Sequence, residues 1–132
     1  MLKKLSAIVL IILLSVALGH AAALKPSALP GFTNVSTVQE GAEFDLNVQP
    51  DEITWTIATF GNMSTFEVTL DASIDYPCST AVYYPVGSMT ETTTVLAQGV
   101  DLTGERCFKG NLRTKTGSGG ITGIKINIRG LE

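Results

Sequence analysis

The sequence predicts an all-β protein: a single antiparallel β-sandwich, immunoglobulin-like or jelly-roll-like, with about eight short strands after a cleaved signal peptide. Three observations predict it. Apolar and polar residues alternate with a period of two in several segments, and turn residues separate these segments at fairly regular spacing. Beyond residue 21, no segment has a sustained stripe of apolar residues at helical spacing. The 132 residues allow one domain, and their sixteen threonines suit the exposed faces of strands.

The N-terminus has the three parts of a secretory signal peptide. Lys3 and Lys4 precede a run of 14 apolar and small residues, 6–19, and small residues follow it. We expect residues 1–21 to be removed, with cleavage as late as residue 23 as the alternative. No stable membrane span then remains, because a span needs about 20 apolar residues. The mature chain is expected to be secreted, extracellular or on the cell surface, or periplasmic if the host has an outer membrane.

The mature chain is expected to comprise an extended arm, residues 22–31, and a β-sandwich domain, residues 32–132. Pro26 and Pro30 disfavour a helix in the arm. In chain order, strands are expected at 32–38 (the least regular), 44–48, 53–57, 66–70, 80–84, 92–97, 106–114 and 124–128. The apolar positions of the alternation are expected to form the core: Phe44, Leu46, Val48, Ile53, Trp55, Ile57, Phe66, Val68, Leu70, Ile124, Ile126 and Ile128.

Cys78 and Cys107 are the two cysteines of the chain. An even number of cysteines in an exported protein favours a disulfide. A reactive thiolate is disfavoured, because there is no CxxC motif and no histidine beyond the signal peptide to lower a thiol pKa. We therefore predict one structural disulfide.

The side-chain inventory argues against an enzyme. His20, the single histidine, is lost with the signal peptide, which excludes a Ser-His-Asp triad, a Cys-His pair and a histidine-containing zinc site. A small carboxylate-dependent hydrolase remains as the remotest alternative, through Asp71 with Asp75 or Asp51 with Glu52. Asp71 and Asp75 are also weak candidates for a calcium site, although a turn with capping carboxylates explains them more simply. No cofactor is expected.

Charge is unevenly distributed along the chain. Residues 25–105 contain one basic and eleven acidic residues, whereas residues 106–132 contain six basic and one acidic residue. The two regions either pair across neighbouring strands of one protomer or attract each other between protomers. A basic face for an anionic ligand is a third interpretation, but nucleic acid is not an expected partner of this acidic protein.

Two Asn-x-Ser sequons are candidate glycosylation sites. They begin at Asn34 and Asn62. Asn62 follows Gly61 between two expected strands, so it is the better exposed candidate.

Together these features predict an exported, non-catalytic structural protein, a self-assembling surface or extracellular filament subunit. Copies of the chain are the expected partner, through strand addition by the arm and through charge complementarity. The candidate contacts are Leu24, Leu29, Phe32, Lys125 and Arg129. The alternative is a monomeric secreted module that binds a surface polysaccharide or a protein through loops at Tyr83–Pro85 and Gly87–Met89.

Overall fold

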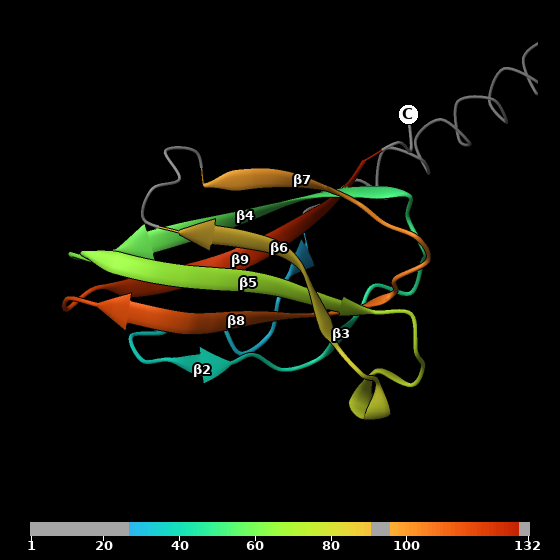
Figure 1. Ribbon diagram of the computed structural model, residues 1–132, viewed down its shortest axis with the longest axis horizontal. Coiled ribbons are helices and arrows are strands. Elements are labelled where there is room, and N and C mark those ends of the chain that lie inside the picture. The colour runs from blue at the N-terminus through green and yellow to red at the C-terminus, as the bar shows by residue number, and fades with distance from the viewer. Residues whose placement is uncertain (1–26, 91–95, 130–132) are drawn as a thin grey trace, which may run out of the picture.

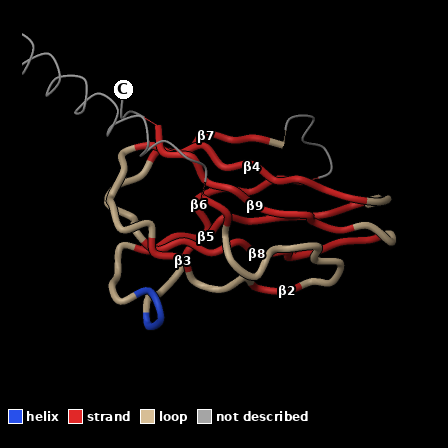
Figure 2. The backbone as a smooth tube through the Cα atoms, turned by 180° about the vertical axis from the view of Figure 1, so that it is seen from behind, coloured by secondary structure: helices blue, strands red, loops and turns tan. Residues whose placement is uncertain are grey.

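The computed structural model describes residues 27–90 and 96–129 and confirms an all-β sandwich of two antiparallel sheets (Figures 1 and 2). One sheet has the strand order β1-β9-β4-β7, and the other has the order β2-β8-β5-β6, with β3 pairing with β8 as well. The strands are β1 (Ser27–Ala28), β2 (Gln39–Glu40), β3 (Phe44–Asp45), β4 (Glu52–Phe60), β5 (Thr65–Ser73), β6 (Tyr84–Thr90), β7 (Ala97–Asp101), β8 (Cys107–Thr116) and β9 (Gly120–Arg129). Among these residues, none forms a helix long and apolar enough to cross a membrane. The signal peptide lies outside the described residues.

The four long strands β4, β5, β8 and β9 form the centre of the sandwich. The chain passes from one sheet to the other between β4 and β5 and again between β8 and β9. The two connecting turns pack against each other, and the Gly119 N–H donates a hydrogen bond to the Asn62 carbonyl at 2.8 Å. Gly61 and Gly117 both have positive φ angles, of 66° and 93°, so glycine suits both turns.

Most of the apolar residues that were expected to point into the core are buried there. Trp55 and its neighbours on β4, β5 and β9 are buried between the sheets, whereas Phe44 and Leu46 are half-buried against the same cluster. The confirmed buried residues are Ile53, Trp55, Ile57, Phe66, Val68, Leu70, Ile124 and Ile126. Ile128 is only half-buried, because it lies near the end of β9 where the sheet meets solvent.

Val48 was expected in the core, and that prediction is wrong, since the side chain is 45% exposed. The strand expected over 44–48 stops at Asp45, the end of β3. Asp45 Oδ1 accepts a hydrogen bond from the Asn47 N–H at 2.8 Å, and Asn47 has a φ of 63°. The turn formed by Asp45 and Asn47 ends the strand, so the alternation of buried and exposed side chains stops before Val48.

The first strand was expected over 32–38, and that prediction is wrong, since no strand lies between β1 (Ser27–Ala28) and β2 (Gln39–Glu40). Ser27 and Ala28 form β1 and pair with Ile126 and Lys125 of β9. The residues that follow are irregular and make a single bridge, from Val35 to Ile121. The arm from Ser27 onward therefore belongs to the sandwich of its own protomer.

Two predictions around β6 are wrong. A strand was expected over 80–84, but a 3-10 helix occupies Cys78–Thr80 and β6 begins only at Tyr84. Consequently Gly87–Met89 lies inside a strand rather than in a loop at the end of the sandwich. Of the strand expected over 92–97, residues 92–95 lie outside the described residues, and β7 runs over Ala97–Asp101.

Candidate functional site

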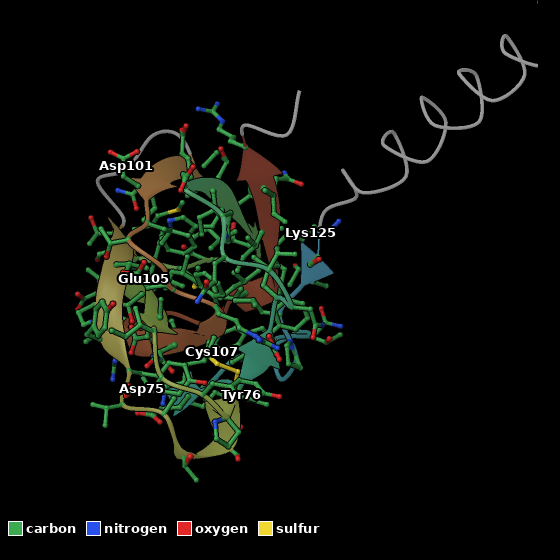
Figure 3. The ribbon with its side chains drawn as sticks, turned by 90° about the vertical axis from the view of Figure 1, so that its right-hand side faces the viewer. Asp75, Tyr76, Asp101, Glu105, Cys107 and Lys125 are labelled. Atoms are coloured by element: carbon green, nitrogen blue, oxygen red, sulfur yellow. A yellow bond between two sulfur atoms is a disulfide. The ribbon has the colours of Figure 1, made fainter. Side chains whose placement is uncertain are left out.

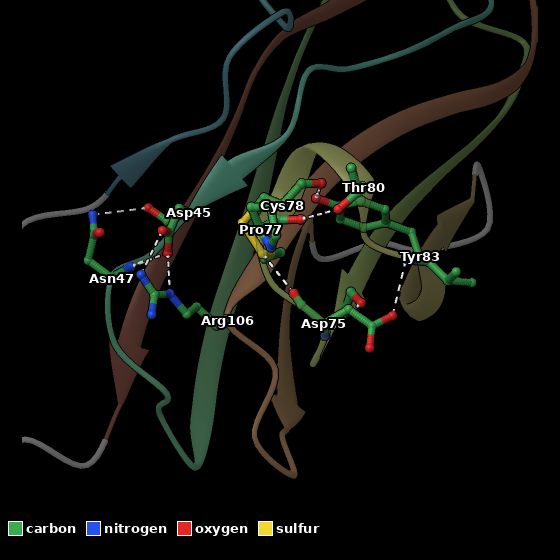
Figure 4. Close-up of a disulfide and its surroundings, with 11 residues drawn as sticks. Asp45, Asn47, Asp75, Pro77, Cys78, Thr80, Tyr83 and Arg106 are labelled. Atoms are coloured by element: carbon green, nitrogen blue, oxygen red, sulfur yellow. Dashed lines mark hydrogen bonds and ion pairs between the residues drawn. A yellow bond between two sulfur atoms is a disulfide. The ribbon is translucent and has the colours of Figure 1, made fainter.

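The structure confirms the disulfide between Cys78 and Cys107 (Figure 4). Their Cα atoms are 5.4 Å apart, within the usual range for a disulfide. The bond ties the segment between β5 and β6 to the first residue of β8. The Tyr83 hydroxyl donates a hydrogen bond to the Cys78 carbonyl at 2.9 Å, which fixes the other end of this segment.

The uneven charge of the chain is largely paired inside one protomer. Arg106 makes a two-pronged ion pair with Asp45, at 2.7 and 2.8 Å, and hydrogen bonding to Arg106 lowers the pKa of the Asp45 carboxyl. The other ion pairs also join a basic residue after 105 to an acidic residue before it: Lys109–Glu40, Arg113–Glu40, Arg113–Asp71 and Arg129–Glu52. The interpretation of pairing across neighbouring strands is therefore confirmed for four of the basic residues.

The structure separates the candidate assembly contacts into two groups. Leu29 and Phe32 are core side chains of their own protomer, 3% and 2% exposed, which corrects their assignment as contacts for another copy. Leu24 lies outside the described residues. Lys125 and Arg129 both face outward from β9, and Figure 3 shows Lys125 on the flank opposite Asp101.

The acidic residues proposed for calcium or for hydrolysis have different surroundings. Asp71 lies within β5, almost fully buried, and its Oδ2 accepts hydrogen bonds from Asn111 and Arg113, both at 2.7 Å. Asp75 lies in the exposed segment after β5 and accepts a hydrogen bond from the Val82 N–H at 3.3 Å. In the described part of the chain, no group of three or more His, Cys, Asp or Glu residues is placed to hold a metal ion.

Asp51 and Glu52 line a pocket of about 290 Å³ at the start of β4. Val48, Pro50 and Ile128 form its apolar part. Glu52 accepts a hydrogen bond from the Arg129 guanidinium at 3.1 Å, so one carboxylate of the pair is already engaged.

Both sequons lie at the surface. Asn34 and Asn62 are exposed, Asn34 in the irregular segment after β1 and Asn62 in the turn between β4 and β5. Exposure makes both asparagines accessible; whether they carry a glycan stays a prediction.

The edge of the sheet at β7 is the most distinctive surface feature of the fold. Ile57 donates a backbone hydrogen bond to Leu96, and Leu102 donates one to Asp51, so residues 96 and 102 face β4. In an antiparallel pair this orientation alternates, and the register from 97 to 101 is uninterrupted. The N–H and C=O groups of Ala97, Gly99 and Asp101 therefore point away from β4, where none of the described strands pairs with them.

Sheet edges are normally protected against pairing with other chains by proline, lysine, bulges or shortness. Strand β6 contains Pro85, and its pairing with β5 is irregular between Leu70 and Asp71 of β5. Strands β1, β2 and β3 are two residues long. In contrast, β7 has five residues in regular register, with Asp101 at its end as the one charge. Among the described edge strands, β7 is the least protected.

A side-chain hydrogen bond within one sheet, from β4 to β7, lies against β6 of the other sheet. The Trp55 Nε1–H donates a hydrogen bond to Gln98 Oε1 on β7 at 3.1 Å. Gly87 of β6 lies against both groups, since a Cβ atom there would be 2.7 Å from Trp55 Nε1 and 2.8 Å from Gln98 Oε1. Glycine at this position lets β6 approach the indole closely, so β6 and β7 lie in contact there.

A second polar contact connects the start of β6 to the loop between β7 and β8. The Tyr84 hydroxyl donates a hydrogen bond to Glu105 at 2.7 Å, which raises the pKa of Tyr84 to about 12. Burial raises the pKa of Glu105, but the hydrogen bonds from Tyr84 and Thr103 outweigh it and leave the pKa below its usual value. Glu105 is thus a buried carboxylate that is stabilised in its charged form.

Sequence reasoning missed the β7 edge. The composition of residues 97–101, without lysine or proline, is the signal that could have found it. Its meaning depends on the strand order, which the sequence pattern does not reveal.

Comparison with known proteins adds information on the fold. No family model matches the sequence, and no curated protein matches it. The crystal structure of the SPBc2 prophage-derived protein YomS is similar, with a TM-score of 0.53 and 16% sequence identity over 78% of this chain and 94% of that chain. The likeness concerns the fold alone.

Proposed function

We propose that this protein is an exported, non-catalytic structural protein that associates with copies of itself by adding a strand at the β7 edge. The observation that carries the proposal is the open edge itself: three residues in regular register present backbone groups that no described strand pairs with, and Asp101 is the one charge among them. Strand addition uses such groups, because the backbone donors and acceptors of one chain match those of another. The disulfide supports export, since disulfides persist in oxidising compartments.

The edge replaces the arm and the charged regions as the main contact. Leu29 and Phe32 are buried within their own protomer, so the arm from Ser27 onward is not available to a neighbour without unfolding. Arg129 is paired with Glu52 in the same chain. Lys125 is the basic residue of β9 for which the described residues offer no acidic partner.

The proposal is tested by measuring the mass of the processed protein in solution by light scattering, over a range of concentrations. We expect the wild type to associate, and Gly99→Pro to remain monomeric because it removes an outward N–H. A Cβ at position 99 meets only ordinary contacts, at 3.6 Å or more, and the melting temperature of the variant checks that the fold is kept. The control, Lys125→Glu, should associate like the wild type, because Lys125 lies on β9 and not on the β7 edge. A wild type that stays monomeric at millimolar concentration would contradict the proposal.

A second candidate function, a binding module, is favoured by the segment between β5 and β6. Ile74, Tyr76 and Val82 are 57%, 64% and 74% exposed on a segment that the disulfide holds in place. The Arg106 guanidinium lies 4.3 Å from the centre of the Tyr76 ring and is itself fixed by Asp45. Rigid exposed apolar side chains are typical of binding surfaces. Binding of the wild type and of Tyr76→Ala to a glycan array tests whether this segment binds carbohydrate. If no glycan binds the wild type more strongly than the variant, the carbohydrate-binding hypothesis is wrong.

A further inference from the structure

We infer that two copies of the protein pair β7 with β7 in antiparallel orientation, around a two-fold axis through Gly99, and that this contact closes as a dimer. The inference rests on the proposed function and specifies its partner, register and symmetry. It joins the two four-stranded sheets into one sheet of the order β1-β9-β4-β7-β7-β4-β9-β1.

The outward backbone groups determine the register. Ala97, Gly99 and Asp101 are the β7 residues whose N–H and C=O groups point away from β4, so they must face the outward residues of the partner strand. Residues that exchange hydrogen bonds in an antiparallel pair lie directly opposite each other. A two-fold axis at Gly99 places Gly99 opposite its own copy and Ala97 opposite Asp101 on both sides. This register pairs every outward group of the strand.

The side chains are compatible with this register. On the outer face, Gly99 faces glycine on the axis, and Asp101 faces Ala97, so the two carboxylates are not opposed. On the inner face, Gln98 lies opposite Val100 of the other copy. The Gln98 side chain already accepts a hydrogen bond from the Trp55 indole of its own copy.

The strand order explains why the contact closes. The edge strands β6 and β7 are in contact on one side, and the two sheets end at their other edges with β1 and β2. The two-residue strands of the second side offer too little edge for a partner to continue the sheet. When a surface patch binds the same patch on a second copy, both patches are occupied by one contact, and the assembly stops at a dimer. A filament would need a second contact elsewhere on the molecule.

Cysteine cross-linking of the processed protein tests the register. In a hydrogen-bonded antiparallel pair the opposed Cα atoms are about 5.5 Å apart, within disulfide range. Gly99→Cys should therefore form a covalent dimer under mild oxidation. Ala97→Cys is the matched control, because its two copies would be four residues apart along the strand, about 14 Å. A mixture of Ala97→Cys with Asp101→Cys should give the mixed covalent dimer.

The wild type should give no covalent dimer, since Cys78 and Cys107 are bonded to each other. Light scattering on the same samples separates the two ways of failing. If the protein associates but Gly99→Cys cross-links no faster than Ala97→Cys, the two-fold register is overturned and strand addition in general survives. If neither association nor cross-linking occurs and each variant keeps the wild-type melting temperature, the inference and the proposed function both fall.

Discussion

Breaking the disulfide should remove a large part of the stability of the fold. Cys78 and Cys107 are 29 residues apart, and the loop-entropy relation for a closed loop of this size gives about 3.6 kcal/mol at 25 °C. Unfolding entropies of about 2.1 cal/mol/K per residue, over the 111 residues after position 21, convert this to a drop of about 15 °C in Tm. The size of the effect follows from the number of residues in the loop, because the bond restricts the unfolded chain.

The assay is thermal unfolding followed by circular dichroism, on oxidised wild type, reduced wild type and the double variant Cys78→Ala with Cys107→Ala. Reduction removes the covalent constraint alone, whereas the double variant also removes two sulfur atoms, of which that of Cys107 is fully buried. Reduced protein should lose about 15 °C, and the double variant slightly more. A reduced wild type that melts within 5 °C of the oxidised form would refute the loop-closure reasoning.

Three further predictions follow from the packing and the polar contacts. Gly87→Ala should destabilise the protein by about 1–3 kcal/mol in denaturant unfolding, because its Cβ would clash with the Trp55 indole; an unchanged midpoint would contradict that contact. Leu29→Ala should cost about 2–5 kcal/mol, and a cost near zero would mean that the arm lies outside the core after all. Glu105→Gln should cost about 1–3 kcal/mol at pH 7. Because the folded pKa of Glu105 is lowered, the wild-type advantage should be complete well above 4.5, the ordinary value, and disappear as pH falls through the lower folded pKa. An advantage that grows on acidification would show the opposite sign of shift.

The sequence pattern predicted the parts of the fold that depend on local alternation. Strands β4 and β9 carry alternating residues with one face buried, so Trp55 and its neighbours could be placed in the core without a structure. The apolar residues of β5 were also placed correctly, although both faces of that strand are buried from Val68 to Ser73. The disulfide followed from the number of cysteines and the expected compartment. In these cases a local signal and the three-dimensional environment agree.

The errors arise where non-local contacts decide the structure. Leu29 is buried because β1 pairs with β9, a partner almost a hundred residues away, and no local pattern reveals that pairing. Val48 is exposed because a short turn at Asp45 and Asn47 ends its strand. The β7 edge depends on strand order, so neither its position nor its lack of protection could be predicted from residues 97–101 alone.

Hydrogen exchange at individual amides of β7, measured at increasing protein concentration, tests strand addition at this edge most directly. The amides of Gln98 and Val100 already face β4, so their exchange should not depend on concentration. The amides of Ala97, Gly99 and Asp101 should exchange rapidly in dilute protein and become protected as copies pair. If these three amides exchange equally fast at every concentration while the protein associates, β7 is not the contact.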